Sequence, residues 1–238
     1  MKIFDFLIRK PIIADQINID GGILEVIKYL GRKEVSNIFD VGAFHGRYAL
    51  ASSKVFENAK IHCFEPSPRA FQVLQRNLVG DRFSLHNSAV SDITGTTKFY
   101  LNENHETNSL LLSTQTNSVV DHLTKYRSEI SVDAITLQQH CRDRNIDSID
   151  LLKVDVQGAT MNVIEGCSEL LQKGKIRLIQ CEVEFLEIYK NQKLFHHVAT
   201  YLEKNDFSLY SLYNLHFDVN ERLSWADALF YKPNENDD

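Results

Sequence analysis

The chain has 238 residues, of which 26 are basic and 32 acidic, so its formal net charge is −6, and 43% of its residues are hydrophobic. This is the composition of an ordinary globular protein, and a chain of this length can bury one large core without disulfides or metals. The mild acidity argues against a nucleic acid as partner, because such proteins usually present a basic surface. No stretch is apolar enough for a membrane span, and the first ten residues, interrupted by Asp5 and Arg9, predict neither a span nor a signal peptide.

The four cysteines lie far apart in the sequence, and none belongs to a C-x-x-C pair. Such spacing predicts neither a zinc site nor a disulfide framework. We therefore expect reduced thiols, a cytoplasmic protein and no bound metal. The cysteines are Cys63, Cys141, Cys167 and Cys181.

The N-terminal part carries two apolar stripes with helical spacing, over residues 3–8 and 23–30. Pro11 and the pair Gly21 and Gly22 separate the two stripes. We expect a helical leader over residues 1–35, a main domain over 36–232 and a frayed tail over 233–238.

From residue 36 onward short apolar runs alternate with amphipathic segments, which is the pattern of βα units around a parallel sheet. Strands are predicted near 36–41, 60–65, 82–87, 96–101, 149–155 and 176–183, and helices near 47–57, 68–78, 136–144, 159–172 and 192–205. Residues 102–128 form a long polar excursion, which in a compact domain is usually a lid or a disordered insert.

The C-terminal part differs, because two aromatic-rich runs over 207–213 and 226–231 have no helical segment between them. A polar loop over 214–224 joins these runs. They should form an antiparallel pair at the end of the sheet.

The first strong functional signal is an apolar strand that runs into an Asp-x-Gly-x-x-x-Gly segment, beginning at Asp40, and then into a helix. Gly42 lets the chain turn where a ligand approaches the backbone, and Gly46 opens a helix whose first amides favour an anion. Nineteen residues after Gly46, Glu65 stands at the end of the second strand, the edge where open α/β sheets bind ligands. A carboxylate there can accept hydrogen bonds from both hydroxyls of a ribose.

The glycine loop fits S-adenosylmethionine better than a dinucleotide. A pyrophosphate is cradled by three glycines in G-x-G-x-x-G, whereas this loop has only Gly42 and Gly46 and carries Asp40 and Phe44 where a phosphate site would avoid charge or bulk. S-adenosylmethionine has no phosphate, and Asp40 would attract its ammonium and sulfonium groups. A nicotinamide-dependent oxidoreductase on the same architecture is the alternative.

The sequence resembles the FkbM-type S-adenosylmethionine-dependent methyltransferases from about Val35 to Tyr231. Four blocks carry the resemblance in this order: Phe39 to Gly46, Phe64 to Pro68, Asn87 to Asp92 with Gly95, and Ile149 to Gly158. The resemblance implies a Rossmann-like class I methyltransferase sheet, α/β in class and mostly parallel with a reversed final strand. It also implies methylation of a hydroxyl on a sugar, a glycan or a secondary metabolite.

The same resemblance implies roles for individual residues in binding the cofactor. The loop around Gly42 would hold the methionine part, Glu65 the ribose, and residues 88–90 would flank the adenine. The complete set of expected cofactor-binding residues is Asp40, Gly42, Ala43, Gly46, Glu65, Ser88, Ala89 and Val90.

Two charged residues stand in or at the end of the apolar strand of the fourth block. Leu151, Lys153 and Asp155 share one face of an extended strand by the period of two. Buried charges are costly unless they serve each other or a ligand. Asp155, at the strand's end beside the glycine loop, is our candidate general base for removing an alcohol proton. For Lys153 an internal ion pair and a role at the site both remain open.

Two further catalytic candidates lie elsewhere in the chain. His45, in the glycine loop, is the second candidate base, because an imidazole titrates near neutrality. Glu182 and Glu184 share a face at the end of an apolar strand, where they could line the substrate site or, with Asp155, hold a divalent cation. No metal site is assigned.

The chain departs from the family pattern at two positions. Gln157 and Thr160 stand where the family commonly has acids. The loss of negative charge weakens the metal hypothesis and keeps open a degenerate methyltransferase that binds cofactor or a partner without turnover. The identity of the small-molecule or glycan acceptor and the oligomeric state, a homodimer included, are not determined by the sequence.

Overall fold

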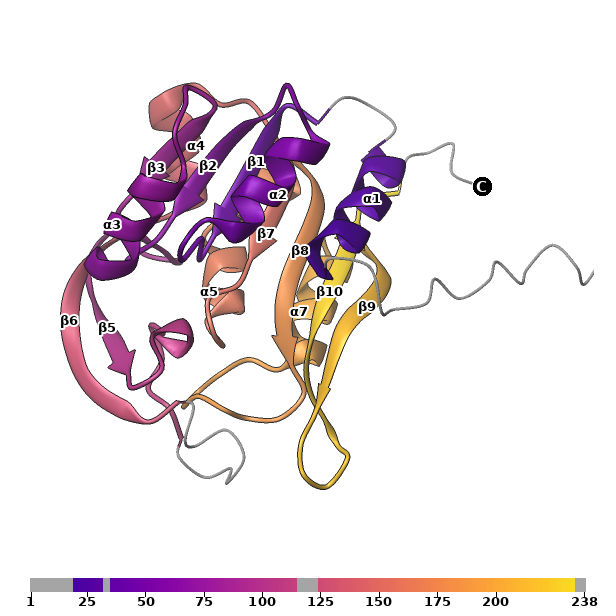
Figure 1. Ribbon diagram of the computed structural model, residues 1–238. Helices are drawn as coiled ribbons and strands as arrows, with labels where there is room; N and C mark the ends of the chain where they lie inside the picture. The colour runs from indigo at the N-terminus through magenta and orange to yellow at the C-terminus, as the bar shows by residue number, and fades with distance from the viewer. Residues whose placement is uncertain (1–18, 32–34, 115–123, 234–238) are drawn as a thin grey trace, which may run out of the picture.

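A seven-stranded sheet forms the centre of the computed structural model, which describes residues 19–31, 35–114 and 124–233. The strand order is β3-β2-β1-β7-β8-β10-β9 (Figure 1). Neighbours pair in parallel except β10, which is antiparallel to both β8 and β9. The predicted mostly parallel sheet with a reversed final strand is confirmed. The strands are β1 (Asn37–Val41), β2 (Lys60–Phe64), β3 (Phe83–His86), β7 (Ile149–Val154), β8 (Ile176–Glu184), β9 (Ser208–Phe217) and β10 (Leu223–Tyr231).

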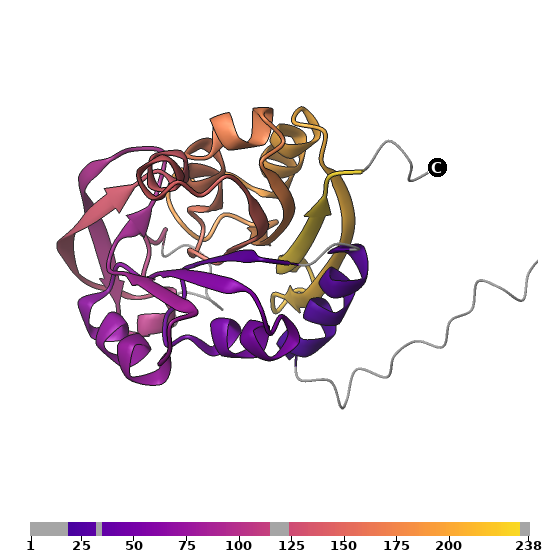
Figure 2. The same ribbon diagram turned by 90° about the horizontal axis from the view of Figure 1, so that it is seen from above.

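Helices cover both faces of this sheet, as Figure 2 shows from above. On one face lie α1 (Ile19–Gly31), α2 (Arg47–Val55) and α3 (Pro68–Asn77). On the other lie α4 (Leu137–Arg144), α5 (Thr160–Glu165), α6 (Ser168–Gln172) and α7 (Phe195–Glu203). Within the described ranges, no helix combines the length and the apolarity needed to cross a membrane.

Each face of the sheet has its own apolar core, because side chains alternate along the central strands. Phe39 and Leu152 belong to the core under α4 to α7, whereas Ile38 and Leu151 belong to the core under α1 to α3. Burial on both faces is expected of parallel strands covered by helices on both sides. It leaves mainly the strand ends and the loops beyond them to carry polar site residues.

The second apolar stripe of the predicted leader is α1. Ile23, Leu24 and Ile27 are buried in the core that α1 shares with α2 and the sheet. The prediction that Gly21 and Gly22 interrupt the helical pattern is wrong, because α1 begins at Ile19 and runs through both glycines. Packing of the apolar face offsets their low helix propensity. The stripe over 3–8, Pro11 and residues 234–238 of the predicted tail lie outside the described residues.

A second sheet of three strands, in the order β4-β6-β5, is only partly predicted by the sequence analysis. It consists of β4 (Ala89–Val90), β5 (Gly95–Asn102) and β6 (Tyr126–Ile135), with the short helix η1 (His105–Thr107) after β5. The strand predicted near 96–101 is confirmed as β5, whereas the sequence analysis predicts a polar excursion over 102–128 and no strand over 129–135. In β6, Ile130, Val132 and Ala134 alternate with the exposed polar residues Glu129, Ser131 and Asp133. The sequence therefore carries the period-two pattern of a half-buried strand, which the prediction overlooked.

Two smaller predictions also need correction. The single helix predicted over 159–172 is divided into α5 and α6 at Gly166, where a Cβ would lie 2.0 Å from the carbonyl oxygen of Ser91. The polar loop predicted over 214–224 is shorter, because β9 extends to Phe217 and β10 starts at Leu223. Asp218 closes this turn by accepting backbone amide hydrogen bonds from residues 220 and 222.

Candidate active site

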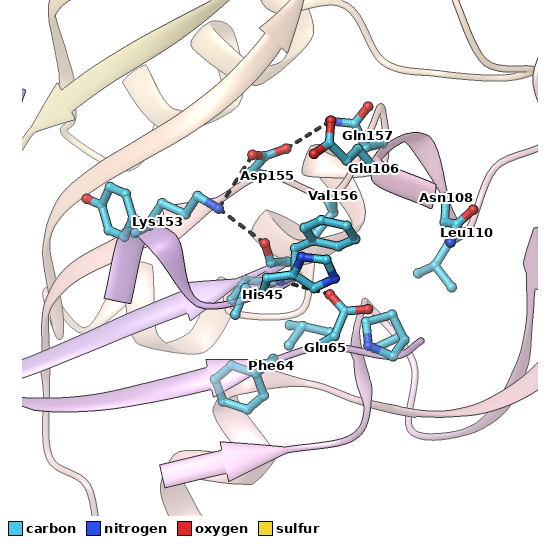
Figure 3. Close-up of a pocket in the computed structure, with 18 of the residues that line it drawn as sticks. His45, Phe64, Glu65, Glu106, Asn108, Leu110, Lys153, Asp155, Val156 and Gln157 are labelled. Atoms are coloured by element: carbon cyan, nitrogen blue, oxygen red, sulfur yellow. Dashed lines mark hydrogen bonds and ion pairs between the residues drawn. The ribbon is translucent and has the colours of Figure 1, made fainter. Parts of the chain in front are cut away.

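A cavity of about 470 Å³ lies at the carboxyl ends of β1, β2 and β7 (Figure 3). This size is within the usual range for sites that bind small molecules. The glycine loop after β1, the segment after β2 and the start of β4 form one side of it, and the end of β7 another. The cavity is therefore where the sequence placed the cofactor, at the ligand-binding edge of an open α/β sheet.

Gly42 is required by the neighbouring strand. Its φ is +78°, and a Cβ there would lie 1.8 Å from the backbone oxygen of Asp155. The amide of Asp155 donates in turn to the carbonyl oxygen of Val41 at 3.0 Å. Gly42 and Ala43 line the cavity as predicted, and the collision of a Cβ with Asp155 adds a second requirement for glycine at this position. The glycine lets β1 and β7 meet at their ends.

Gly46 lies behind the cavity wall. It begins α2 with a φ of +85°, and a Cβ would lie 2.9 Å from side-chain atoms of Leu74 and Leu78. It is not among the residues that line the cavity. Its predicted contribution to the cofactor site is therefore indirect, through the packing of the loop on α3.

Asp40 is also buried behind the wall. Its carboxylate is fully buried, and its Oδ1 lies 3.2 Å from Nζ of Lys153. Asp40 is absent from the cavity lining. Its position therefore gives no support to the prediction that it attracts a cationic ligand directly.

Lys153 links Asp40 to the end of β7. Its ammonium lies 3.5 Å from Oδ2 of Asp155 and 3.3 Å from the carbonyl oxygen of Gly42. Burial alone would lower the pKa of Lys153, but the negative charges of Asp40 and Asp155 more than offset this and raise it. The internal ion pair is present, and Lys153 also lines the cavity, where a role at the site stays a prediction.

Glu65 brings a nearly buried carboxylate to the cavity. The residue is 5% exposed, and its two carboxylate oxygens accept the backbone amides of Phe44 at 2.9 Å and Ser67 at 2.8 Å. Burial raises its pKa to about 7, although these two hydrogen bonds and the charge of Lys153 act in the opposite direction. Each oxygen retains capacity for a further hydrogen bond. The predicted partners Ser88, Ala89 and Val90 line the same cavity.

Asp155 stands at the other side of the cavity with its side chain 41% exposed. Gln157 holds it in place: the Gln157 amide donates to Oδ1 of Asp155 and to Oε2 of Glu182, both at 2.9 Å. Gln157 has a φ of +56°, and its backbone oxygen accepts the hydroxyl of Ser109 at 2.6 Å. A left-handed conformation is uncommon for such a residue and is often found at functional sites.

The two acids in the last part of β8, Glu182 and Glu184, are not among the residues that line the cavity. Glu182 is absent from the cavity lining, and burial together with the charge of Asp155 raises its pKa well above the usual range. Burial likewise raises the pKa of Glu184 to about 8. Among the described side chains, Asp155, Glu182 and Glu184 do not form a group close enough to share one metal ion. Glu182 is linked to the candidate base Asp155 through the Gln157 amide.

His45, the second candidate base, lines the cavity. Its ring is stacked on that of Phe44, with the centroids 3.7 Å apart. The Asn77 amide donates to the His45 backbone oxygen at 2.9 Å and so ties the loop to α3. His45 and Asp155 both border the cavity, on the glycine loop and at the end of β7 respectively (Figure 3).

Much of the remaining lining comes from elements that the sequence analysis did not place at the site. Phe99 on β5 and the segment around η1 form a wall, and Gln180 and Asp227 contribute from β8 and β10. Asp227 shows the signal that singled out Lys153, a charge within an apolar strand. The η1 segment lies in the polar excursion predicted over 102–128, where no single residue stands out in this way. The lining residues besides the predicted ones are Val41, Phe44, Arg47, Tyr48, Phe64, Pro66, Phe99, His105, Glu106, Asn108, Leu110, Val156, Gln157, Gln180 and Asp227.

Comparison with known proteins identifies related sequences. The family model described as the methyltransferase FkbM domain matches residues 40–209. The 2-O-methyltransferase NoeI of Sinorhizobium fredii is 33% identical over 162 residues, which cover 65% of this chain and 66% of that protein. The 31-O-demethyl-FK506 methyltransferase FkbM of Streptomyces tacrolimicus is 27% identical over 168 residues, covering 61% and 64% respectively. The matched region spans just under two thirds of each relative's length.

The fold also has a counterpart among solved structures. The crystal structure of a protein described as an S-adenosylmethionine-dependent methyltransferase from Listeria monocytogenes superposes with a TM-score of 0.53 at 10% sequence identity. The match covers 90% of this chain and 98% of that chain. At this identity the likeness supports the class I methyltransferase architecture and nothing finer.

Proposed function

Because the chain belongs to the FkbM methyltransferase domain family, a family of S-adenosylmethionine-dependent enzymes, we propose that it transfers a methyl group to a hydroxyl of a sugar, a glycan or another small metabolite. One structural observation carries this proposal. The buried carboxylate of Glu65 faces a cavity at the carboxyl end of β2, between the glycine loop and the start of β4.

The residues of the cavity fit S-adenosylmethionine. Glu65 would hold the ribose, since both of its oxygens can accept a further hydroxyl hydrogen bond. Ala89, Val90 and Phe99 offer apolar surface for the adenine. Arg47, in the first turn of α2, also lines the cavity and complements the carboxylate of the methionine part. When bound, the cofactor supplies an electrophilic methyl group on a sulfonium.

Asp155 would accept the proton of the acceptor hydroxyl. As an alcohol oxygen forms a new bond to carbon it gains positive charge, and its proton becomes strongly acidic. A carboxylate is therefore a sufficient base, despite the nearby Lys153 ammonium, provided that it is held in position. Gln157 and Lys153 hold one oxygen each of Asp155. His45 is the second candidate for this role, on the glycine-loop side of the cavity.

The names of the two relatives support oxygen as the acceptor atom, because one is a 2-O-methyltransferase and the other acts on a 31-O-demethyl compound. The nicotinamide alternative is disfavoured by the family assignment and by the missing third glycine. We further propose a cytoplasmic location, consistent with four buried, free cysteine thiols.

Titration calorimetry with S-adenosylmethionine, S-adenosylhomocysteine and NAD tests the cofactor. We expect the first two to bind and NAD not to bind; binding of NAD alone would replace the proposal by the oxidoreductase alternative. A panel of hydroxylated acceptors, followed by mass spectrometry of the products, then tests transfer. Cofactor binding with no methylated product from any acceptor would favour the degenerate methyltransferase.

A further inference from the structure

Three histidines outside the cavity converge on one point. His62 lies on β2, His86 ends β3, and His140 lies on α4. Potential ligand nitrogens of the three, one from each side chain, all lie within 4.8 Å of one another. No short sequence motif connects them, since they are 24 and 54 residues apart. The topology alone brings them together.

The pairing of β2 with β3 explains the convergence. His62 is opposite Ser84 and Phe64 is opposite His86, so His62 and His86 are diagonal neighbours on one face of the sheet. Helix α4 packs on this face, at the edge of the sheet formed by β3 (Figure 1). His140 thus meets the other two histidines from above the sheet.

We propose that His62, His86 and His140, here called the histidine cluster, form a binding site for a divalent transition-metal ion of the zinc type. Imidazole nitrogen is a preferred ligand for Zn²⁺, Co²⁺ and Ni²⁺, and three histidines are an established protein ligand set that leaves one further coordination position. Small side-chain movements would bring the three nitrogens to coordination distance.

Unsatisfied nitrogens support this proposal. His62 and His140 are 6% and 3% exposed, and Nδ1 of His62 and Nε2 of His140 are buried with no hydrogen-bond partner among the described residues. A buried polar atom without a partner lowers stability, so such atoms are rare in folded proteins. A metal ion between the rings would satisfy nitrogens that neither protein groups nor solvent reach.

Aromatic packing accounts for the rings but not for their nitrogens. The rings of Phe39 and Phe64 lie 4.6 Å from His62 and 4.9 Å from His140, respectively, so phenylalanine would fill the histidine positions without a polar penalty. His86 differs from the other two because it is only partly buried and its Nε2 contacts Oγ of Ser84 at 3.0 Å. The partly exposed side of His86 offers an entry path for an ion.

The charge state of the cluster suits metal binding. Burial is the main cause that lowers the pKa of His62 and His86 to about 4 and that of His140 to about 3, so all three imidazoles are neutral near pH 7. Neutral imidazole is the form that binds metal. Lys60 and Arg144 place positive charge nearby, so the affinity should be lower than at a site with a carboxylate ligand.

The proposed ion would connect α4 to the outer part of the sheet. The histidine cluster does not line the cavity, yet Phe64, which does, packs against the rings of His86 and His140. The ends of β2 and β3 lead directly to Glu65 and Ser88 at the cavity. The role of the ion is therefore structural, in fixing the strands that carry the predicted ribose and adenine contacts.

The experiment uses the full chain, stripped with a chelator, unfolded in urea and refolded with Co²⁺ or with Zn²⁺. We expect one metal ion per chain after desalting, the visible absorption of tetrahedral or five-coordinate Co²⁺, and a higher melting temperature than without metal. Refolded, folded protein that holds neither ion would overturn the proposal.

Variants assign the ligands. His140→Phe and His86→Phe preserve ring packing and should each weaken Co²⁺ binding by at least about 100-fold, since loss of an outer-shell partner alone costs 10–100-fold. The double variant His196→Gln and His197→Gln is the control, because it removes the adjacent pair on α7 and should retain the bound ion. His86, at the sheet edge, provides a folded variant if His140→Phe does not fold. Unchanged Co²⁺ binding in folded His86→Phe would show that the cluster is not the site.

Discussion

Glu65 combines a nearly buried carboxylate with a position in the cavity wall. Its carboxylate is held by two backbone amides and sits in a cavity that removes it from water. If it accepts two ribose hydroxyls, Glu65→Ala should weaken S-adenosylmethionine binding by about 1.5–3 kcal/mol, the range of hydrogen bonds to charged groups. Calorimetric dissociation constants measure this effect. Glu57→Ala, an exposed acid beyond α2, is the control and should bind normally. Equal affinity of the two variants would refute the ribose assignment.

The raised pKa of Glu65 predicts how binding depends on pH. Only the ionised carboxylate can accept from both hydroxyls, and burial holds the pKa of the free protein at about 7. Affinity for the cofactor should therefore rise with pH up to about 7 and then level off, and should fall about tenfold per pH unit well below 7. Dissociation constants between pH 5.5 and 8.5 test this. Glu65→Ala should lack this dependence, and a wild-type affinity independent of pH would contradict the assignment.

The same residue should affect stability in the opposite direction. Its folded pKa lies above its ordinary value of 4.5, so the folded state binds more protons between those two values. The contribution of Glu65 to stability is then fully present below about pH 4.5 and is lost as the pH rises through about 7. Cofactor affinity and ligand-free stability therefore respond to this carboxylate with opposite signs.

Asp155 allows a test of the chemical step. Asp155→Asn keeps the size and loses the basicity, so turnover should fall by about 10² to 10⁴ while the cofactor dissociation constant changes little. Lys153 remains paired with Asp40 at 3.2 Å in this variant, so the melting temperature should change only modestly. Steady-state kinetics and thermal unfolding are measured together.

The control for this variant is Asp133→Asn, an exposed acid on β6. It should leave turnover unchanged. Normal turnover in a folded Asp155→Asn protein would transfer the base role to His45. A protein that fails to fold would instead indicate that Asp155 is mainly the partner of Lys153.

Residue-level prediction from the sequence succeeded where strand period and strand order both applied. Glu65 and Asp155 follow apolar strands, so their place at one edge of the sheet could be predicted. Asp40 lies one residue before the end of β1. Its side chain does not line the cavity and instead pairs with Lys153 inside the protein. The sequence suggested that the Asp40 carboxylate attracts a cationic ligand, but the cation next to it in the structure is the ammonium group of Lys153.

The glycine loop carries a test at the level of secondary structure elements. Gly42→Ala places a Cβ 1.8 Å from the carbonyl oxygen of Asp155, so the ends of β1 and β7 must move apart. Gly80→Ala is the matched control, because Gly80 also has a positive φ, of +118°, but nothing lies within 4 Å of its added Cβ. Gly42→Ala should reduce the free energy of unfolding by more than about 2 kcal/mol beyond the control. Urea unfolding measures the difference, and equal losses would mean that the strand ends tolerate separation.

Elements were predictable to the extent that they bury a periodic apolar face. The strands and helices around the main sheet do so, and their predicted ranges agree with the structure to within a few residues. The second sheet was predicted only in part, because the strand at β5 was recognised while the period-two alternation of its partner β6 was overlooked. The histidine cluster was unpredictable for a different reason, since it depends on the register of β2 with β3 and on the placement of α4.

At the scale of the whole molecule, α1 determines whether the sequence boundary near residue 35 is a domain boundary. Three of its side chains, Ile23, Leu24 and Ile27, are at most 2% exposed and join the core beneath α2. Full burial of each contributes about 1.5–3 kcal/mol, so their removal should cost on the order of 5–9 kcal/mol. The total stability of a domain is only about 5–15 kcal/mol.

A chain of residues 36–238 should therefore unfold at much lower temperature than the full chain or fail to fold, even though every residue that lines the cavity is retained. Circular dichroism during heating measures this, and single variants separate the packing of α1 from other effects of truncation. Leu24→Ala should lower the free energy of unfolding by about 2–5 kcal/mol. Tyr29→Ala should lower it little, because the Tyr29 side chain on the same helix is 67% exposed. If the shortened chain unfolds at the temperature of the full chain and Leu24→Ala matches Tyr29→Ala, α1 is a separable leader and the domain begins after it.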